Sequence, residues 1–186
     1  MVEITSLWLP VLLAAVIVFV VSSIIHMVLG YHRNDFRKLP DEDGVMEALG
    51  KFNIPPGDYQ MPCSGGPQGM KSPEFIEKMK RGPVALITVL PRGGPSIGKN
   101  LAMWFLYSIV ISIFAAYICS RVLRTGANYL DVFRYAGTTA FAGYSLALLQ
   151  DSIWHGRAWG TTLRSVFDGL LYALVTAGSF GWLWPK

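Results

Sequence analysis

The sequence predicts an all-α membrane protein with four transmembrane helices and one large polar loop between the first two helices. Two observations lead to this fold class. The chain is 52% hydrophobic with a mean hydropathy of +0.40, which is high for a soluble domain of 186 residues. Its charges gather in one segment, because residues 31–99 hold 10 of the 16 basic and 8 of the 12 acidic side chains. The expected organisation is a single membrane domain over residues 1–186.

The first predicted span covers residues 7–29. Residues 7–25 carry no charge, and nineteen helical residues at about 1.5 Å each approach the roughly 30 Å of a bilayer core. We interpret this segment as a retained anchor and not a cleaved signal peptide. Its N-terminal flank carries Glu3 without a basic residue, and no small-residue cleavage site follows.

The other predicted spans cover residues 101–120, 133–154 and 166–184. Residues 101–119 are uncharged, which makes this span as clear as the first. The third and fourth spans rest on shorter uncharged runs, 135–150 and 169–185, near the lower limit for crossing a bilayer. A buried helical hairpin is the soluble alternative for these two segments.

The flanking basic residues predict the orientation of the chain. More of them adjoin the large loop (residues 31–99) and the loop between spans three and four than the other side, which places both loops in the cytoplasm and both termini outside. The tryptophans then predict two interfacial belts. The outer belt contains Trp8, Trp182 and Trp184, and the inner belt contains Trp104, Trp154 and Trp159.

The large loop is rich in helix-breaking residues. It holds nine of the eleven prolines and ten glycines, which predicts a mostly irregular backbone. Two short helices are expected within it, one at residues 42–49 capped by Asp41 and one that starts at Ser72 and Pro73. Residues 84–90 (VALITVL) are rich in β-branched side chains and predict a strand or an interfacial segment.

Residues 93–100 (GGPSIGKN) resemble a phosphate-binding loop, because they follow a strand-like run and precede a helix. However, Asn100 stands where a Ser or Thr hydroxyl would bind magnesium, and the helix that follows is a predicted membrane span. These facts argue against a nucleotide as a partner. Nucleic acid is excluded as well, since the basic residues form no stripe with interleaved aromatics.

Small residues recur every four positions on three of the predicted spans. In lipid, close backbone approach between helices depends on such residues, so each series predicts a helix-packing interface, within this chain or with a partner. The interface residues are Ser108, Ser112, Ala116 and Ser120 on the second span, Thr139, Gly143 and Ala147 on the third, and Gly169, Ala173, Ala177 and Gly181 on the fourth.

Four ionisable residues lie near the cytoplasmic ends of the predicted spans: His26, Asp151, His155 and Asp168. Asp151 and His155 are four positions apart and would share a helix face. A polar cluster at the interface that fixes helix register is the favoured interpretation, because polar groups cost least at span ends. Alternatively, His26 and His155 could bind haem or a quinone. No catalytic signature and no metal site are predicted.

Three stretches of the sequence resemble a known group of proteins. The stretches are YHRNDFRKLPDED from Tyr31, FRYAGTTAFAGY from Phe133 and QDSIWHGRAWGTTL from Gln150. They are similar to a family of small uncharacterised bacterial inner-membrane proteins, and the likeness extends over most of the chain. The resemblance implies a location in the bacterial inner membrane. It brings no activity, cofactor or catalytic residue with it.

The sequence therefore predicts a non-enzymatic accessory or scaffolding subunit that packs against a larger membrane complex. Its partners would be membrane lipids and other membrane subunits, and by analogy the complex could be a respiratory or photosynthetic electron-transfer complex. No cofactor is expected under this hypothesis. Two alternatives remain open: a haem- or quinone-binding subunit, and a small transporter or channel that works as an oligomer.

Overall fold

The computed structural model describes residues 2–186 and divides into two compact units. Unit 1 comprises the chain up to Arg37 together with Ile97–Lys186, and unit 2 is Lys38–Ser96. The expectation of a mostly helical protein is confirmed. The two strands of unit 2 are the exception to the all-α class.

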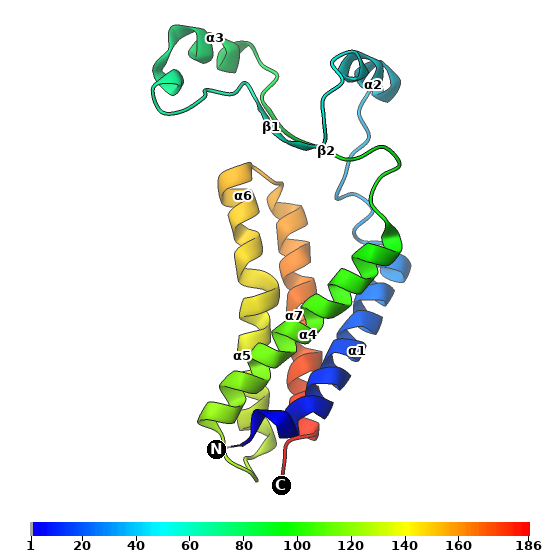
Figure 1. Ribbon diagram of the computed structural model, residues 1–186, viewed down its shortest axis with the longest axis vertical. Helices are drawn as coiled ribbons and strands as arrows, with labels where there is room; N and C mark the ends of the chain where they lie inside the picture. Colours follow the sequence, from blue (N-terminus) through cyan, green and yellow to red (C-terminus); the bar gives the residue numbers. More distant parts are fainter. Residues whose placement is uncertain (1) are drawn as a thin grey trace. The chain divides into compact units, whose positions relative to one another are not determined.

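Unit 1 is a bundle of helical rods that contact one another in a ring, α1 with α4, α4 with α5, α5 with α7 and α7 with α1 (Figure 1). Consecutive rods run antiparallel, so the start of the first rod and the end of the last rod lie at the same end of the bundle. The elements are η1 (Ile4–Leu7), α1 (Trp8–Ile24), the π-helical turn η2 (Ile25–Leu29), α4 (Ile97–Val122), α5 (Tyr129–Ser145), the 3-10 turn η4 (Leu146–Leu148), α6 (Leu149–His155) and α7 (Trp159–Trp182).

Two of these rods are long and apolar enough to cross a membrane. They are Ile4–Leu29 and Ile97–Val122, each of 26 residues, with mean hydropathies of 2.8 and 2.1. In the most apolar 18-residue stretch of each rod, only 28% is buried inside the protein, so both rods present apolar side chains outward.

The prediction of four such helices is not supported by this criterion. Within residues 2–186, the other two rods do not combine the length and the hydropathy of a membrane span, although α7 is long enough with its 24 residues. The third rod changes from α-helix to a 3-10 turn after Ser145, and α7 carries Arg164 and Asp168 in its first half. The break shortens the regular helix of the third rod, and the charges lower the mean hydropathy of α7.

The small residues of the second and fourth predicted spans pack inside the bundle. Ser108, Ser112 and Ala116 on α4 are fully buried, as is Ala177 on α7. Gly169 permits the closest approach, since a Cβ at that position would lie 2.1 Å from Oγ of Ser145 on α5. These faces therefore serve helix contacts within this chain.

The third rod packs through a different face from the one expected. Thr139 is half-buried and donates to the carbonyl of Tyr135 in its own helix, and Ala147 is exposed in η4. The buried face of α5 consists of Val132, Ala136, Ala140 and Tyr144. Gly143 lies beside this face, where an added Cβ would meet the side chain of Ile111 on α4.

Two of the six tryptophans do not occupy the exposed positions that an interfacial belt requires. Trp184 is buried and donates from Nε1 to the carbonyl of Arg124, at 2.9 Å. Trp104 is half-buried and points its indole nitrogen at Ser22. Both exceptions arise because the indole N–H has a hydrogen-bond partner inside the protein.

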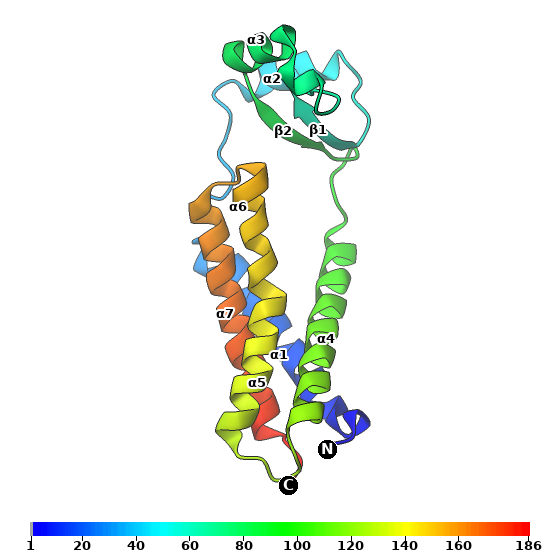
Figure 2. The ribbon, with the colours of Figure 1, turned by 90° about the vertical axis from the view of Figure 1, so that its left-hand side faces the viewer.

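Unit 2 contains more regular structure than an irregular loop, which corrects the expectation for residues 31–99. Its elements are α2 (Glu42–Gly50), β1 (Gly57–Met61), η3 (Gly69–Lys71), α3 (Pro73–Arg81) and β2 (Ala85–Val89). The strands pair antiparallel from Gly57 opposite Val89 to Met61 opposite Ala85 (Figure 2). This pairing satisfies backbone groups that an irregular loop would leave to water.

The local predictions within unit 2 are confirmed. The Asp41 side chain accepts from the backbone N–H of Gly44 at the start of α2, and the Ser72 side chain accepts from Phe75 at the start of α3. Residues 85–89 form the predicted strand. The partner strand β1 was not predicted, because its five-residue sequence GDYQM begins with glycine and contains no β-branched residue.

Candidate functional site

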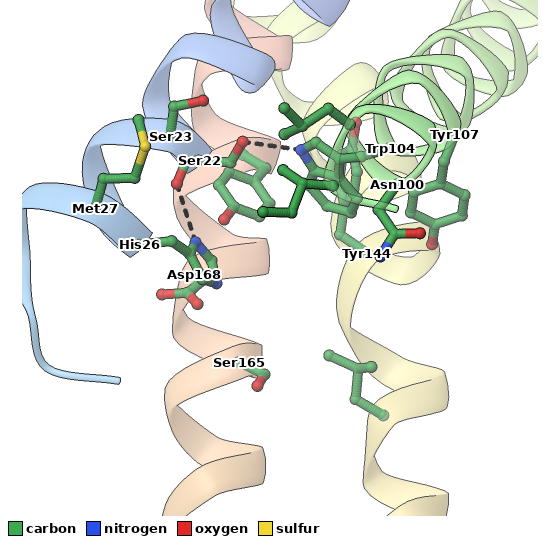
Figure 3. Close-up of a pocket in the computed structure, with 14 residues that line it drawn as sticks. Ser22, Ser23, His26, Met27, Asn100, Trp104, Tyr107, Tyr144, Ser165 and Asp168 are labelled. Carbon is green, nitrogen blue, oxygen red and sulfur yellow. Dashed lines mark hydrogen bonds between the residues drawn. The ribbon is translucent and has the colours of Figure 1, made fainter. Parts of the chain in front are cut away.

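A cavity of about 630 Å³ lies among the rods of unit 1 (Figure 3). It draws its lining from α1 with η2, from α4, from α5 with η4, and from α7. The lining residues are Ser22, Ser23, His26, Met27, Ile97, Asn100, Leu101, Trp104, Tyr107, Tyr144, Leu148, Ser165, Asp168 and Tyr172. Most of the lining is apolar or aromatic, and His26 and Asp168 contribute its ionisable groups.

Four aromatic rings form a contiguous group in the cavity wall. The ring centroid of Trp104 lies 5.6 Å from those of Tyr107 and Tyr172, and the centroids of Tyr144 and Tyr172 are 5.5 Å apart. The Tyr144 and Tyr172 rings meet at 73°, an edge-to-face geometry that aromatic pairs favour. The group gives the cavity a wall suited to a flat apolar molecule.

Ser22 connects this aromatic wall to His26. The indole N–H of Trp104 donates to Oγ of Ser22 at 2.8 Å, and Nδ1 of His26 lies 2.9 Å from the backbone carbonyl oxygen of Ser22 (Figure 3). A carbonyl oxygen only accepts, so Nδ1 of His26 carries the proton. The same residue therefore holds one aromatic ring and one imidazole in fixed orientations.

The end of the first rod brings a second group of polar side chains to the cavity. The π-helical turn Ile25–Leu29 carries His26, and such turns occur often at functional sites. Gly30 ends the rod with φ +65°, a left-handed conformation that favours glycine. The chain then reverses and directs Tyr31 and His32 toward α7.

We define the polar cluster as His26, Tyr31, His32, Asp35, Arg164 and Asp168. His32 lies at its centre, with Nδ1 2.7 Å from Oδ2 of Asp35 and Nε2 2.8 Å from Oδ2 of Asp168. The Tyr31 hydroxyl donates to Oδ1 of Asp168, and Arg164 donates to Oδ1 of Asp35. Asp168 is only 3% exposed, so these contacts replace its hydration.

The cluster shifts the pKa of two of its members. Burial by itself would raise the pKa of Asp35, but hydrogen bonds from His32 and Arg164 and the charges of both lower it below the usual value. Burial raises the pKa of the Tyr31 hydroxyl, and the hydrogen bond to Asp168 and its negative charge raise it further. Tyr31 is therefore a hydrogen-bond donor at any physiological pH.

Three members of the cluster together offer ligand atoms of the kind that metals bind. One ligand atom each from His26, His32 and Asp168 lies within 4.8 Å of the others. The His26 and His32 rings are also stacked, with centroids 4.6 Å apart and planes 4° from parallel.

The structure brings together two of the four predicted cluster residues, His26 and Asp168. Asp151 and His155 pair with each other instead, at 3.4 Å, with side chains 45% and 65% exposed. Neither residue lines the cavity. A haem held by His26 and His155 gains no support from this arrangement, because the ring stacked on His26 is that of His32.

Sequence reasoning missed Tyr31, His32, Asp35 and Arg164. Two signals were present in the sequence. His32 and Asp35 are three positions apart shortly after the first predicted span, and Arg164 and Asp168 are four apart at the start of the fourth. Neither spacing shows that the two pairs meet, because 129 positions separate Asp35 from Arg164.

Comparison with protein-family models, with curated proteins and with solved structures finds no match to this chain.

Proposed function

We propose that this chain is a membrane-embedded binding protein whose ligand is a lipid-soluble ring compound of the quinone class. One observation carries the proposal. An aromatic cavity of about 630 Å³ places four contiguous rings beside one polar end formed by His26 and Asp168. Apolar pockets of roughly 300–1,000 Å³ with a few fixed polar groups are typical of small-molecule sites.

The proposal includes an integral location in the bacterial inner membrane, with all four rods in the bilayer and both chain ends outside. Ile4–Leu29 and Ile97–Val122 support two of these spans by length and hydropathy. The outward apolar side chains of α5 and α7, such as Leu130, Phe167 and Leu174, support the other two. The four exposed tryptophans, Trp8, Trp154, Trp159 and Trp182, are suited to the membrane interfaces.

Two tyrosines add to the case for a polar ring ligand. The hydroxyls of Tyr144 and Tyr172 are buried, and neither has a hydrogen-bond partner of good geometry within residues 2–186. A buried donor without a partner costs about 1–3 kcal/mol. A carbonyl oxygen that reached either hydroxyl after a small rotation of the ring would remove that cost, and quinones carry two such oxygens.

His26 and Asp168 supply the complementary polar end. His26 donates from Nδ1 to Ser22, so in the neutral ring Nε2 is an acceptor. Asp168 already accepts from Tyr31 and His32, which keeps its carboxylate fixed. A hydroquinone, which donates through its hydroxyls, matches these acceptors.

Binding of a short-chain benzoquinone to the full chain in lipid nanodiscs, measured by calorimetry, tests the proposal. We expect one saturable site. Trp104→Ala should weaken binding about tenfold or more, because it removes the ring at the centre of the aromatic wall. The control is Trp182→Ala, which removes a tryptophan that is 75% exposed and outside the cavity.

Tyr172→Phe provides a milder variant that keeps the ring and the fold. Removing its hydroxyl should weaken binding about two- to tenfold, the equivalent of one hydrogen bond. Equal affinity of wild type, Trp104→Ala and Tyr172→Phe, or no saturable binding at all, would reject the quinone site.

An accessory subunit of a larger membrane complex is the second candidate. The small-residue faces on α4 and α7 pack within this chain, so a partner protein would have to contact the outward faces of the rods. Those faces are rich in large apolar side chains, which suit a helical partner as well as lipid. Extraction in mild detergent should then yield a stoichiometric partner, and a lone chain under several gentle conditions would contradict this candidate.

A further inference from the structure

We infer that His26, His32 and Asp168 form a binding site for a divalent first-row transition-metal ion of the zinc class. The proposal rests on the three ligand atoms within 4.8 Å of one another and on the way the surrounding residues orient them. It does not depend on the proposed quinone ligand, because the ion would bind to side chains alone.

The first ligand, His26, has the orientation that metal-binding histidines usually have. Its Nδ1 donates to the backbone carbonyl of Ser22, at 2.9 Å. Donation of this kind fixes the tautomer and the ring and leaves Nε2 as the ligand atom. His26 is exposed and lines the cavity, so an ion has access to it.

The second ligand, His32, is oriented by a carboxylate. Its Nδ1 lies 2.7 Å from Oδ2 of Asp35, and Asp35 is held in turn by Arg164. This Asp–His arrangement places the other nitrogen, Nε2, toward Asp168 at 2.8 Å. A carboxylate on one nitrogen and a metal on the other is the usual environment of a ligating histidine.

The third ligand, Asp168, is held on one oxygen and has its other oxygen at the site. The Tyr31 hydroxyl donates to Oδ1, while Oδ2 faces His32. An ion between Oδ2 and Nε2 of His32 would take the place of the proton that now joins these two atoms. All three ligands therefore have a second polar contact that holds them in place.

The charges of the cluster favour a bound cation. The cluster holds two carboxylates and one permanent cation: Arg164 pairs with Asp35, and Asp168 pairs with His32. The carboxylate side chains are 9% and 4% exposed. Buried charge is costly unless it is compensated, so the remaining negative charge calls for a proton on His32 or for a metal ion.

The stacking of the two imidazole rings also supports a bound metal ion. Their centroids are 4.6 Å apart, and one ligand nitrogen of each ring lies within 4.8 Å of the other, so one ion can reach both. A neutral imidazole is the form that binds metals. The rings are parallel, so they must tilt toward each other to converge on one ion.

The donor set identifies the class of metal. Two imidazoles and one carboxylate suit zinc, iron(II) and related ions, whereas calcium and magnesium prefer oxygen ligands throughout. Three protein ligands beside a cavity leave a further coordination position for water or for a bound molecule. The site thus has the composition of an open metal centre and not of a closed structural one.

Titration of the chelator-treated full chain in detergent with Zn²⁺ alone, followed by calorimetry, tests the site. We expect one ion per chain. Co²⁺ bound in place of Zn²⁺ should show visible absorption bands whose positions reflect histidine ligation. Added Zn²⁺ should displace Co²⁺ and abolish these bands. His26→Ala should weaken Zn²⁺ binding about tenfold or more, since loss of an orienting residue alone costs that much.

The variants separate binding from folding. Among residues 2–186, the hydrogen bond of the His26 side chain is to the Ser22 carbonyl one turn earlier, so His26→Ala should keep the wild-type helical circular dichroism spectrum. Asp168→Asn, which keeps the size of the side chain, should also weaken binding. The control is His155→Ala, which removes a histidine outside the cluster and should bind Zn²⁺ like the wild type.

Two outcomes would overturn the inference. One is the absence of saturable binding at one Zn²⁺ per chain. The other is wild-type affinity in both His26→Ala and Asp168→Asn, which would place any bound ion elsewhere on the chain. Either result would leave the quinone hypothesis open, because quinone binding to chelator-treated protein is measured without added Zn²⁺.

Discussion

A buried histidine–aspartate pair, His32 and Asp168, and an exposed one, His155 and Asp151, lie in unit 1 and differ in almost everything except residue type. His32 and Asp168 come from opposite ends of the sequence and meet at 2.8 Å, with side chains 13% and 4% exposed. Asp151 and His155 are one helical turn apart and meet at 3.4 Å, with side chains 45% and 65% exposed. The first pair has two further polar partners in the cluster, Tyr31 on Asp168 and Asp35 on His32, whereas Arg157 is a further partner of the second.

The difference shows that burial and additional hydrogen-bond partners decide how much such a pair contributes to stability. Water screens the exposed pair, so its interaction contributes at most about 1 kcal/mol. The buried pair has lost its water, so each group depends on the others for its charge compensation. The four predictions that follow run from the largest expected effect to the smallest, beginning with the buried pair and its partners and ending with the exposed pair.

Asp168→Ala should produce the largest loss of stability. It removes a buried carboxylate that accepts from Tyr31 and His32, and breaking a buried pair in this way typically costs about 3–5 kcal/mol. Unfolding in a single detergent would measure the change. Asp151→Ala is the matched control and should stay within about 0.5 kcal/mol of the wild type. Equal losses in the two variants would erase the distinction between the pairs.

Asp35→Asn should have the next largest effect. The amide cannot compensate the charges of Arg164 and His32, and a weakened charge-assisted network costs about 1–3 kcal/mol of unfolding free energy. The same variant should weaken Zn²⁺ binding about 10–100-fold, because it removes the residue that orients His32. A loss of stability with unchanged Zn²⁺ affinity would show that His32 is not a metal ligand.

Tyr31→Phe should destabilise the protein by about 1 kcal/mol. It removes the hydroxyl that donates to Asp168 and leaves one carboxylate oxygen with fewer donors. Tyr59→Phe in unit 2 is the control, since the Tyr59 hydroxyl donates to the carbonyl of Pro55 at an exposed site. Thermal unfolding of the two variants side by side should place Tyr31→Phe lower, and the opposite order would contradict the assigned role of Tyr31.

His155→Ala should have the smallest effect. Its partner Asp151 is exposed and retains Arg157 within 3.7 Å, so the free energy of unfolding should change by less than about 0.5 kcal/mol. Quinone and Zn²⁺ binding should not change at all. A marked loss of either ligand would mean that the exposed pair belongs to the site after all.

Local sequence signals predicted a good part of this fold. The uncharged runs within residues 7–25 and 101–119 gave the two apolar rods, and Asp41, Ser72 and Pro73 gave the starts of α2 and α3. Each of these features depends on residues within a few positions of one another. Strand β1 was missed because its stability comes from pairing with β2, about thirty positions away.

Only two of the four residues of the predicted polar cluster, His26 and Asp168, lie together in the structure. The other two were misassigned because contacts between distant segments are not visible in local sequence. The position of His26 and Asp168 at span ends is visible in the sequence, and so is the i,i+4 spacing of Asp151 and His155. The sequence does not show which span ends face the bundle interior. The small-residue face of the third rod was misplaced because α5 buries the adjacent series Val132, Ala136, Ala140 and Tyr144, which small-residue spacing by itself does not indicate.

The amino-acid sequence by itself determined the apolar rods, the helix caps and the segregation of charge into residues 31–99, because these follow from hydropathy and short-range hydrogen bonding. The tertiary structure decided which polar groups meet. Tyr31 and His32 contact Asp168 across 137 and 136 positions, through a reversal at Gly30 and the packing of α1 against α7. Contacts of that separation depend on how whole helices pack, and no local pattern records it.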